Sequence, residues 1–220
     1  MKLAIIGASG KTGTKLVREA LKHGYQVVAV CRESSVGKLD KFSEYDELVV
    51  VSAPVVSDEA TLRQALVGCN AVVVLPISVR RLKATELVLA LANATAANGV
   101  KRLLFTAGEI TTGLEEFEKH TLRQRFMLPS YTLMTWFTPY SLTDMRKATT
   151  LIRQQSDWDW TIVRAPTLTD SPPVGYSFCG ITEVTFKDAL SREDYASCLL
   201  DLLDEPEYYR RILTVVSAKG

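Results

Sequence analysis

The 220-residue chain is 47% hydrophobic and 23% charged, and its formal net charge is +1. Length and composition favour one compact α/β domain over residues 1–220, and the near-neutral charge gives no electrostatic reason to expect nucleic acid or a membrane surface as a partner. The four cysteines are scattered without zinc-site or disulfide spacing, and no apolar run reaches the roughly 18 residues of a membrane span. We therefore expect a cytoplasmic protein without a bound metal.

The first predicted strand, residues 2–6, leads directly into the motif GASGKTG, which opens a predicted helix over residues 11–23. Glycines at positions 7, 10 and 13 allow a tight turn, the close approach of a phosphate, and close packing of the helix on the strand. The unpaired N–H groups and the dipole at a helix start attract anions. Glycines could serve packing alone, but their place between the first strand and the first helix favours a dinucleotide site.

The second predicted strand, residues 26–30, bears on which dinucleotide binds. An acidic residue at its end would bind the ribose hydroxyls of NAD, whereas an arginine there accommodates the 2′-phosphate of NADP. Arg32 follows this strand and Lys11 offers a second cation, so the sequence favours NADP. Glu33 keeps NAD open as the alternative, because a shift of one residue would bring its carboxylate to the same position.

The next part of the chain alternates strands with helices. Three further runs are continuously apolar, as in parallel strands buried on both faces: residues 47–51, 71–75 and 102–106. Helical patterns lie between or after them: residues 58–67, 80–98 and 141–156. Ser57 is the expected N-cap of the first of these helices, and Gly99 is expected to end the second. This alternation predicts a Rossmann-like doubly wound parallel sheet with helices on both faces.

Residues 109–140 interrupt the alternation, and we expect them to form a lid or insertion with a charged helix over residues 114–127. The C-terminal part returns to regular elements: strands at 160–165, 183–186 and 212–216, and a helix at 192–204. Ser191 and the acidic residues after it are typical of a helix start. Residues 166–190 are expected to form a small region on the substrate side of the sheet.

Five segments in this order, GASGKTG, GCNAVVVLP, GVKRLLFTAGE, DWTIVRAPTLTD and LSREDYA, resemble the NmrA-like, NAD(P)H-binding branch of the atypical short-chain dehydrogenases/reductases. Within this branch the sequence is most similar to the biliverdin-IXβ/flavin reductase type. The similarity covers nearly the whole chain outside residues 109–140. It implies a Rossmann fold, a nicotinamide dinucleotide cofactor and a reductase activity.

The resemblance also implies which residues bind the cofactor. Residues 7–13 would hold the pyrophosphate, Arg32 the 2′-phosphate, and the segments after later strands the ribose and nicotinamide. The family often has Gly-Asp at the end of the third strand, where this chain has Pro54 and Val55, so apolar contact would hold the adenine. The expected cofactor-binding residues are Gly7, Ala8, Ser9, Gly10, Lys11, Thr12, Gly13, Arg32, Val55, Leu75, Pro76, Thr106, Ala107, Lys147, Pro166, Thr167 and Leu168.

The catalytic set of the classical relatives is incomplete. They use a serine and a tyrosine placed four residues before a lysine, which lowers the pKa of the tyrosine. Lys147 is a candidate lysine, with a solvated surface lysine as the alternative, but Tyr140 lies seven residues before it. Ala107 occupies the serine position, and Thr106 next to it keeps a hydroxyl. The candidate catalytic residues are therefore Thr106, Tyr140 and Lys147.

Two functions follow from these observations. One is an NADP-dependent oxidoreductase that reduces a flat conjugated small molecule such as a flavin or quinone, because hydride transfer from the cofactor needs mainly stacking and orientation. The other is a non-catalytic, NmrA-like protein whose NADP(H) occupancy regulates a protein partner. A sugar-nucleotide epimerase or dehydratase is a weaker third hypothesis, because it needs the missing tyrosine and a larger substrate domain.

Overall fold

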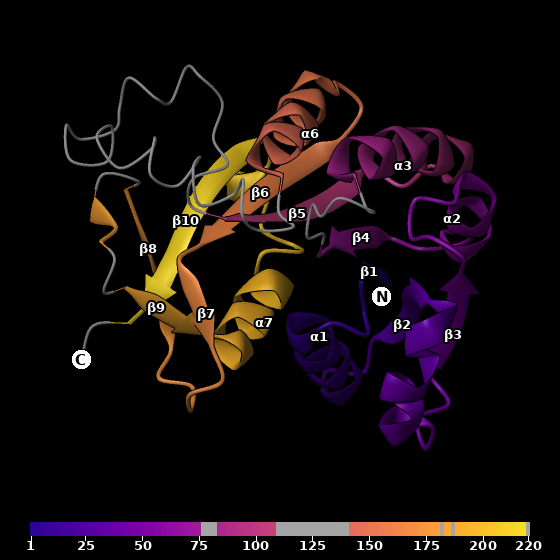
Figure 1. Ribbon diagram of the computed structural model, residues 1–220, viewed down its shortest axis with the longest axis horizontal. Helices are drawn as coiled ribbons and strands as arrows, with labels where there is room; N and C mark the ends of the chain where they lie inside the picture. Colours follow the sequence, from indigo (N-terminus) through magenta and orange to yellow (C-terminus); the bar gives the residue numbers. More distant parts are fainter. Residues whose placement is uncertain (76–82, 109–140, 181–182, 186–187, 219–220) are drawn as a thin grey trace.

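The computed structural model describes residues 1–75, 83–108, 141–180, 183–185 and 188–218. Its centre is an eight-stranded sheet with the strand order β3-β2-β1-β4-β5-β6-β10-β8 (Figure 1). The strands of this sheet are β1 (Lys2–Ile6), β2 (Gln26–Arg32), β3 (Leu48–Ala53), β4 (Ala71–Val74), β5 (Arg102–Gly108), β6 (Asp159–Ala165), β8 (Tyr176–Cys179) and β10 (Arg211–Ser217). Every neighbouring pair is parallel except β10 and β8, which run antiparallel. The predicted Rossmann-like α/β fold is confirmed.

Helices cover both faces of this sheet. The described helices are α1 (Lys11–Lys22), α2 (Glu59–Ala65), α3 (Ala84–Asn98), α6 (Leu142–Gln154) and α7 (Arg192–Asp201), with 3-10 helices η1 (Glu33–Phe42) and η3 (Pro206–Tyr208). On one face α1 packs beside α7, and on the other α3 packs between α2 and α6 (Figure 1). Each layer has its own buried apolar cluster: Leu16 and Leu199 belong to the first, and Leu87 and Ala148 to the second.

Oxygen-bearing side chains cap most of the described helices. Asp58, and not Ser57 as the sequence indicated, caps α2, because its carboxylate accepts hydrogen bonds from both the amide and the hydroxyl of Thr61. Gly99 ends α3 in the left-handed conformation, as expected. The start of α3 is capped from a neighbouring helix, since Asp144 of α6 accepts a 2.6 Å hydrogen bond from the amide of Ala84.

The edges of the sheet differ from the sequence prediction. Residues 47–51 are apolar throughout and were expected to be buried on both faces, but β3 is an edge strand. Val49 and Val50 are 53% and 37% exposed there. The reason is that an edge strand has neighbours on one side only, which periodicity in the sequence does not reveal.

The segment between β8 and α7 also differs. Residues 183–185 are not in a strand, because Thr185 and Asp188 form a turn in which the Asp188 carboxylate accepts a hydrogen bond from the Thr185 amide. Instead two short strands, β7 (Thr167–Thr169) and β9 (Ala189–Ser191), pair in parallel as a separate two-stranded sheet. The helix expected over residues 114–127 lies outside the described residues.

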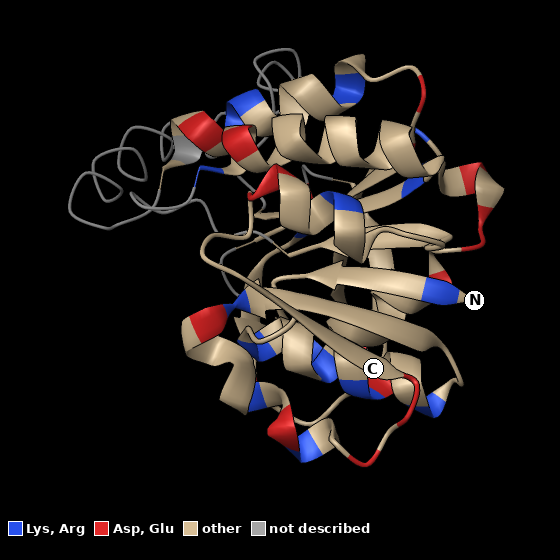
Figure 2. Cartoon of the chain, turned by 90° about the vertical axis from the view of Figure 1, so that its right-hand side faces the viewer, with Lys and Arg blue, Asp and Glu red and all other residues tan. Residues whose placement is uncertain are grey.

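Charged residues of both signs are interspersed over the outer helices and loops, with mainly uncharged strands between them (Figure 2). Among the helices that the structure describes, none is long and apolar enough to cross a membrane.

Candidate functional site

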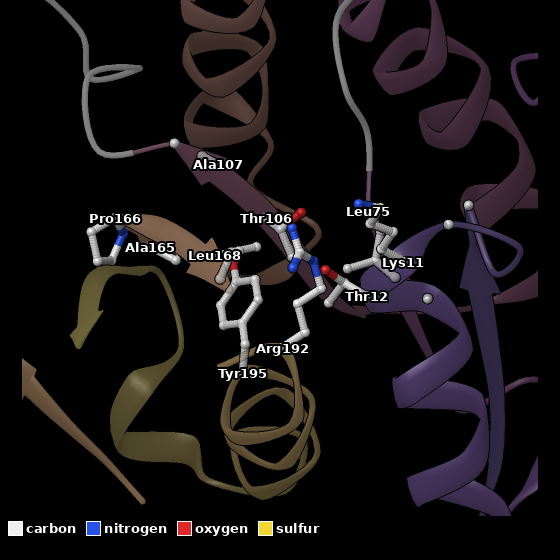
Figure 3. Close-up of a pocket in the computed structure, with 14 residues that line it drawn as sticks. Lys11, Thr12, Leu75, Thr106, Ala107, Ala165, Pro166, Leu168, Arg192 and Tyr195 are labelled. Atoms are coloured by element: carbon white, nitrogen blue, oxygen red, sulfur yellow. The ribbon is translucent and has the colours of Figure 1, made fainter. Parts of the chain in front are cut away.

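A cleft of about 530 Å³ opens at the point where the strand order reverses, between β1 and β4 (Figure 3). Open α/β sheets bind ligands at this point, outside the carboxyl ends of the strands. Ten of the residues expected from the sequence line the cleft: Gly7, Gly10, Lys11, Thr12, Gly13, Leu75, Thr106, Ala107, Pro166 and Leu168. The fold therefore brings together segments that are widely separated in the sequence.

Gly7 makes the turn out of β1, and two features require glycine here. Its φ is +86°, in the left-handed region, and a Cβ atom would lie 2.9 Å from the carbonyl oxygen of Leu75. The amides of Gly7 and Ala8 both donate to the carbonyl of Val30 in β2. The turn is thus fixed against the two neighbouring strands, β4 and β2.

Gly13 and Gly10 differ in their surroundings. A Cβ atom on Gly13 would lie 2.3 Å from the carbonyl oxygen of Gly7 and 2.6 Å from that of Ala8, so α1 packs on the turn backbone itself. Gly10 is exposed and in extended backbone (φ −72°, ψ 169°), and a Cβ there would meet only the Gly7 carbonyl, at 3.2 Å. Gly7 and Gly13 thus have a packing role, whereas Gly10 keeps the cleft side of the turn free of a side chain.

The start of α1 differs from the starts of the other described α-helices. Side-chain oxygens hydrogen-bond the first-turn amides of those helices: Asp58 for α2, Asp144 for α3, Ser141 for α6 and Ser191 for α7. At α1 the N-cap is Gly10, which provides no such bond, and the first turn contains no acidic residue. The amides of Lys11, Thr12 and Gly13 have no carbonyl one turn earlier to bond to. This end of α1 lines the cleft and can bind an anion.

Two hydroxyl groups meet at the floor of the cleft. The Tyr195 hydroxyl, buried beneath Thr106, donates a 2.8 Å hydrogen bond to the carbonyl of Val163. Burial raises the pKa of Tyr195 well above its ordinary value of 10, and a hydrogen bond from the Thr106 hydroxyl offsets only part of this rise. The phenol stays protonated at neutral pH with its proton on a backbone carbonyl. It is therefore poorly suited to act as a proton donor.

Arg192, the first residue of α7, lines the same cleft, and its side chain is 16% exposed. Its guanidinium pairs with Asp170 at 3.1 Å. Figure 3 shows the side chain rising from α7 toward the start of α1. Arg192, Tyr195, Gly108 and Ala165 line the cleft but were missed by the sequence analysis. The sequence contains a signal for Arg192 and Tyr195, because the serine of the segment LSREDYA is typical of a helix start. The local sequence does not reveal that this helix begins at the carboxyl edge of the sheet.

Several expected cofactor-binding residues lie outside the cleft lining. Ala8 is fully buried under the turn, and the Ser9 hydroxyl hydrogen-bonds the buried Cys31. Arg32 and Val55 are exposed, at the end of β2 and just after β3, and Lys147 is exposed on α6. Thr167 is exposed in β7. Pro76 and Tyr140 lie outside the described residues.

Comparisons with known proteins agree with this geometry. A family model described as NAD(P)H-binding matches residues 7–206. The uncharacterized protein YwnB of Bacillus subtilis (strain 168) is 51% identical over 35 residues, so the match spans 16% of this chain and 16% of that curated relative.

Solved structures share the fold over their whole length. A short-chain dehydrogenase/reductase from Veillonella parvula DSM 2008 in complex with NADP has a TM-score of 0.78 and 18% identity, covering 100% of this chain and 95% of that one. The anaerobilin reductase ChuY from Escherichia coli O157:H7 has a TM-score of 0.77 and 15% identity, covering 100% and 98%. At these identities the similarity shows a fold shared with short-chain dehydrogenases/reductases. Because the family model spans nearly the whole chain, the protein belongs to the NAD(P)H-binding family.

Proposed function

We propose that this protein is an NADP(H)-dependent oxidoreductase that reduces a flat conjugated small molecule such as a flavin or quinone. The observation that carries the proposal is the composition of the cleft. One end is the uncapped start of α1, and the other is a wall of apolar side chains: Ala107 near the end of β5, Pro166 directly after β6 and Leu168 in β7. An anion site joined to an apolar wall fits a cofactor with a pyrophosphate and a planar ring.

The preference for NADP is part of the proposal and rests on Arg32. The amides of Gly7 and Ala8 donate hydrogen bonds to the carbonyl of Val30, so the glycine-rich turn lies directly against the last residues of β2. Val30 is two residues before Arg32. An exposed guanidinium there can reach a 2′-phosphate without first leaving a buried partner. Glu33, the alternative, begins η1 and is also exposed. Its carboxylate would favour NAD.

The chain's own contribution to the reaction is binding and orientation. A bound NADPH would supply the hydride, and water the proton that accompanies it into the reduced acceptor. Apolar residues at the ends of β5 and β6 would align the two rings, and residues 166–190 would form the substrate side. A flavin or quinone suits this cleft, because the Thr106 hydroxyl donates to Tyr195 and the Tyr195 hydroxyl donates to the carbonyl of Val163, so neither hydroxyl proton is directed to a ligand. The proposal includes a cytoplasmic location, because cysteines that are scattered without disulfide spacing fit a reducing compartment.

The same hydroxyl pair favours a second candidate function. A dinucleotide-binding site whose described hydroxyl groups are not tuned as proton donors also suits a non-catalytic, NmrA-like regulator, with NADP(H) occupancy altering its contact with a protein partner. Such a protein would bind NADPH but would not oxidise it with any of the acceptors.

A panel of acceptors separates these functions. We expect the purified protein to oxidise NADPH under anaerobic conditions with at least one flavin or quinone, and NADH more slowly at equal concentration. NADPH binding measured by calorimetry in the same preparation is the control. Tight binding without turnover for every acceptor would contradict the oxidoreductase and support the regulator.

A further inference from the structure

We infer that Arg192 is a second anion-binding group of the dinucleotide site and contacts the pyrophosphate from the side opposite α1. This inference rests on the proposed function, because it assumes that a dinucleotide occupies the cleft. It adds a residue from the C-terminal part of the chain to a site that the glycine motif defines at the N-terminal end.

The packing of two helices sets the position of Arg192. α7 lies beside α1, and Lys15 of α1 pairs with Glu193 of α7 at 2.8 Å, so the two helices are joined near their starts. Ser191 caps α7 by accepting a hydrogen bond from the Asp194 amide. The backbone at the start of α7 is therefore satisfied internally, and the Arg192 side chain extends into the cleft, toward Thr12 at the start of α1 (Figure 3).

The positive charges around the cleft favour the binding of an anion between them. The start of α1 carries the positive end of a helix dipole, Lys11 adds a cation there, and the Arg192 guanidinium faces it from α7. Within the described part of the chain, the residues that line the cleft include no Asp or Glu. An arginine stays charged at any physiological pH, so Arg192, Lys11 and the start of α1 together favour an anion in the cleft, even though Asp170 already pairs with the guanidinium. A pyrophosphate, with its charge spread over several oxygens, can accept bonds from both sides at once.

The bond to Asp170 does not occupy Arg192 fully. It joins one terminal nitrogen of the guanidinium to one carboxylate oxygen, and the Asp170 side chain is 57% exposed, so solvent weakens the attraction between them. A guanidinium has five N–H donors and forms its strongest bonds to carboxylates and phosphates in a bidentate arrangement. Arg192 can therefore bind phosphate oxygens while it keeps or releases Asp170.

Separate substitutions of the two partners of the ion pair, Arg192 and Asp170, test the inference. We expect Arg192→Gln to weaken NADP⁺ binding by roughly 10- to 100-fold, the range for a charge-assisted bond. Asp170→Asn leaves the guanidinium in place and should bind NADP⁺ at least as tightly as the wild type. If Arg192 acted only by anchoring the loop that carries Asp170, the two variants would weaken binding together, and that result would overturn the inference.

Glu193→Gln is the matched control. It breaks an ion pair between the same two helices, outside the cleft, and should leave the dissociation constant for NADP⁺ within about twofold of the wild type. Asp170→Asn also keeps the test usable if Arg192→Gln does not fold, since weaker NADP⁺ binding by Asp170→Asn alone would contradict the inference.

A second experiment shows whether the anion that Arg192 binds belongs to the cofactor or to the acceptor. If Arg192 instead binds an acidic group of the acceptor, Arg192→Gln will leave NADP⁺ binding unchanged and raise KM for flavin mononucleotide but not for riboflavin. That outcome would overturn the inference while the proposed function stands. Failure of the wild-type protein to bind NADP⁺ or NADPH at all would instead refute the proposed function.

Discussion

Replacing Gly10 by valine should separate ligand binding from folding in the glycine-rich turn. The backbone of Gly10 is in the extended region that valine adopts readily, and the new Cβ would meet only the Gly7 carbonyl oxygen, at 3.2 Å. Valine is a poorer N-cap than glycine. Together these effects should lower the free energy of unfolding by no more than about 1–2 kcal/mol.

The effect on binding should be larger. Gly10 lines the cleft directly before the free amides of Lys11, Thr12 and Gly13, and two methyl groups there would block the approach of a phosphate. Each charge-assisted hydrogen bond contributes about 1.5–3 kcal/mol. Loss of two of them corresponds to at least a hundredfold weaker binding, since every 1.4 kcal/mol is a factor of about ten.

The assay combines calorimetric titration with NADPH and urea-induced unfolding, and Gly13→Ala provides the contrast. A Cβ on Gly13 would lie 2.3 Å and 2.6 Å from two backbone carbonyl oxygens, so α1 must move away from the turn. We expect a loss of about 1–3 kcal/mol or more in unfolding free energy for this variant. Wild-type NADPH affinity in Gly10→Val would refute the phosphate-approach argument, and wild-type stability in Gly13→Ala would refute the packing argument.

Four further predictions concern other residues. Arg32→Ala should weaken NADP⁺ binding by about 1–3 kcal/mol and leave NAD⁺ binding nearly unchanged in calorimetry; equal losses would contradict the 2′-phosphate assignment. Tyr195→Phe should cost about 1 kcal/mol of stability through the lost bond to Val163 and leave turnover within a few-fold, whereas a hundredfold loss would reveal a proton donor. Asp144→Ala should lower the unfolding free energy by about 1–2 kcal/mol, because α3 loses its cap; unchanged urea unfolding would count against this. Lys147→Ala should mainly weaken NADPH affinity with little change in turnover, and an unaltered affinity would identify it as a surface lysine.

The glycine-rich turn could be predicted from the sequence because its determinants are local. Gly7, Gly10 and Gly13 lie within seven residues, from the end of β1 to the first turn of α1, and their spacing together with this position indicates the geometry. The four central strands β1, β2, β4 and β5 were also predictable, since buried parallel strands are continuously apolar. The cap of α3 was not, because its donor Ala84 and acceptor Asp144 are 60 residues apart.

The missed part of the site depends on tertiary contacts. Arg192 and Tyr195 reach the cleft only because α7 packs beside α1 and begins at the carboxyl edge of the sheet. No local pattern encodes that packing. The short strands β7 and β9, of three residues each, were missed for a related reason, because strands of that length carry too little periodicity to be recognised.

A crystal structure of the NADP⁺ complex would test the central claim most directly. The claim is that one dinucleotide spans the cleft, with its pyrophosphate at the start of α1 and its nicotinamide at the ends of β5 and β6. We expect phosphate oxygens within hydrogen-bonding distance of the amides of Thr12 and Gly13, and the nicotinamide ring beside Ala107 and Pro166. A dinucleotide bound elsewhere, or bound in the reverse orientation, would contradict the account.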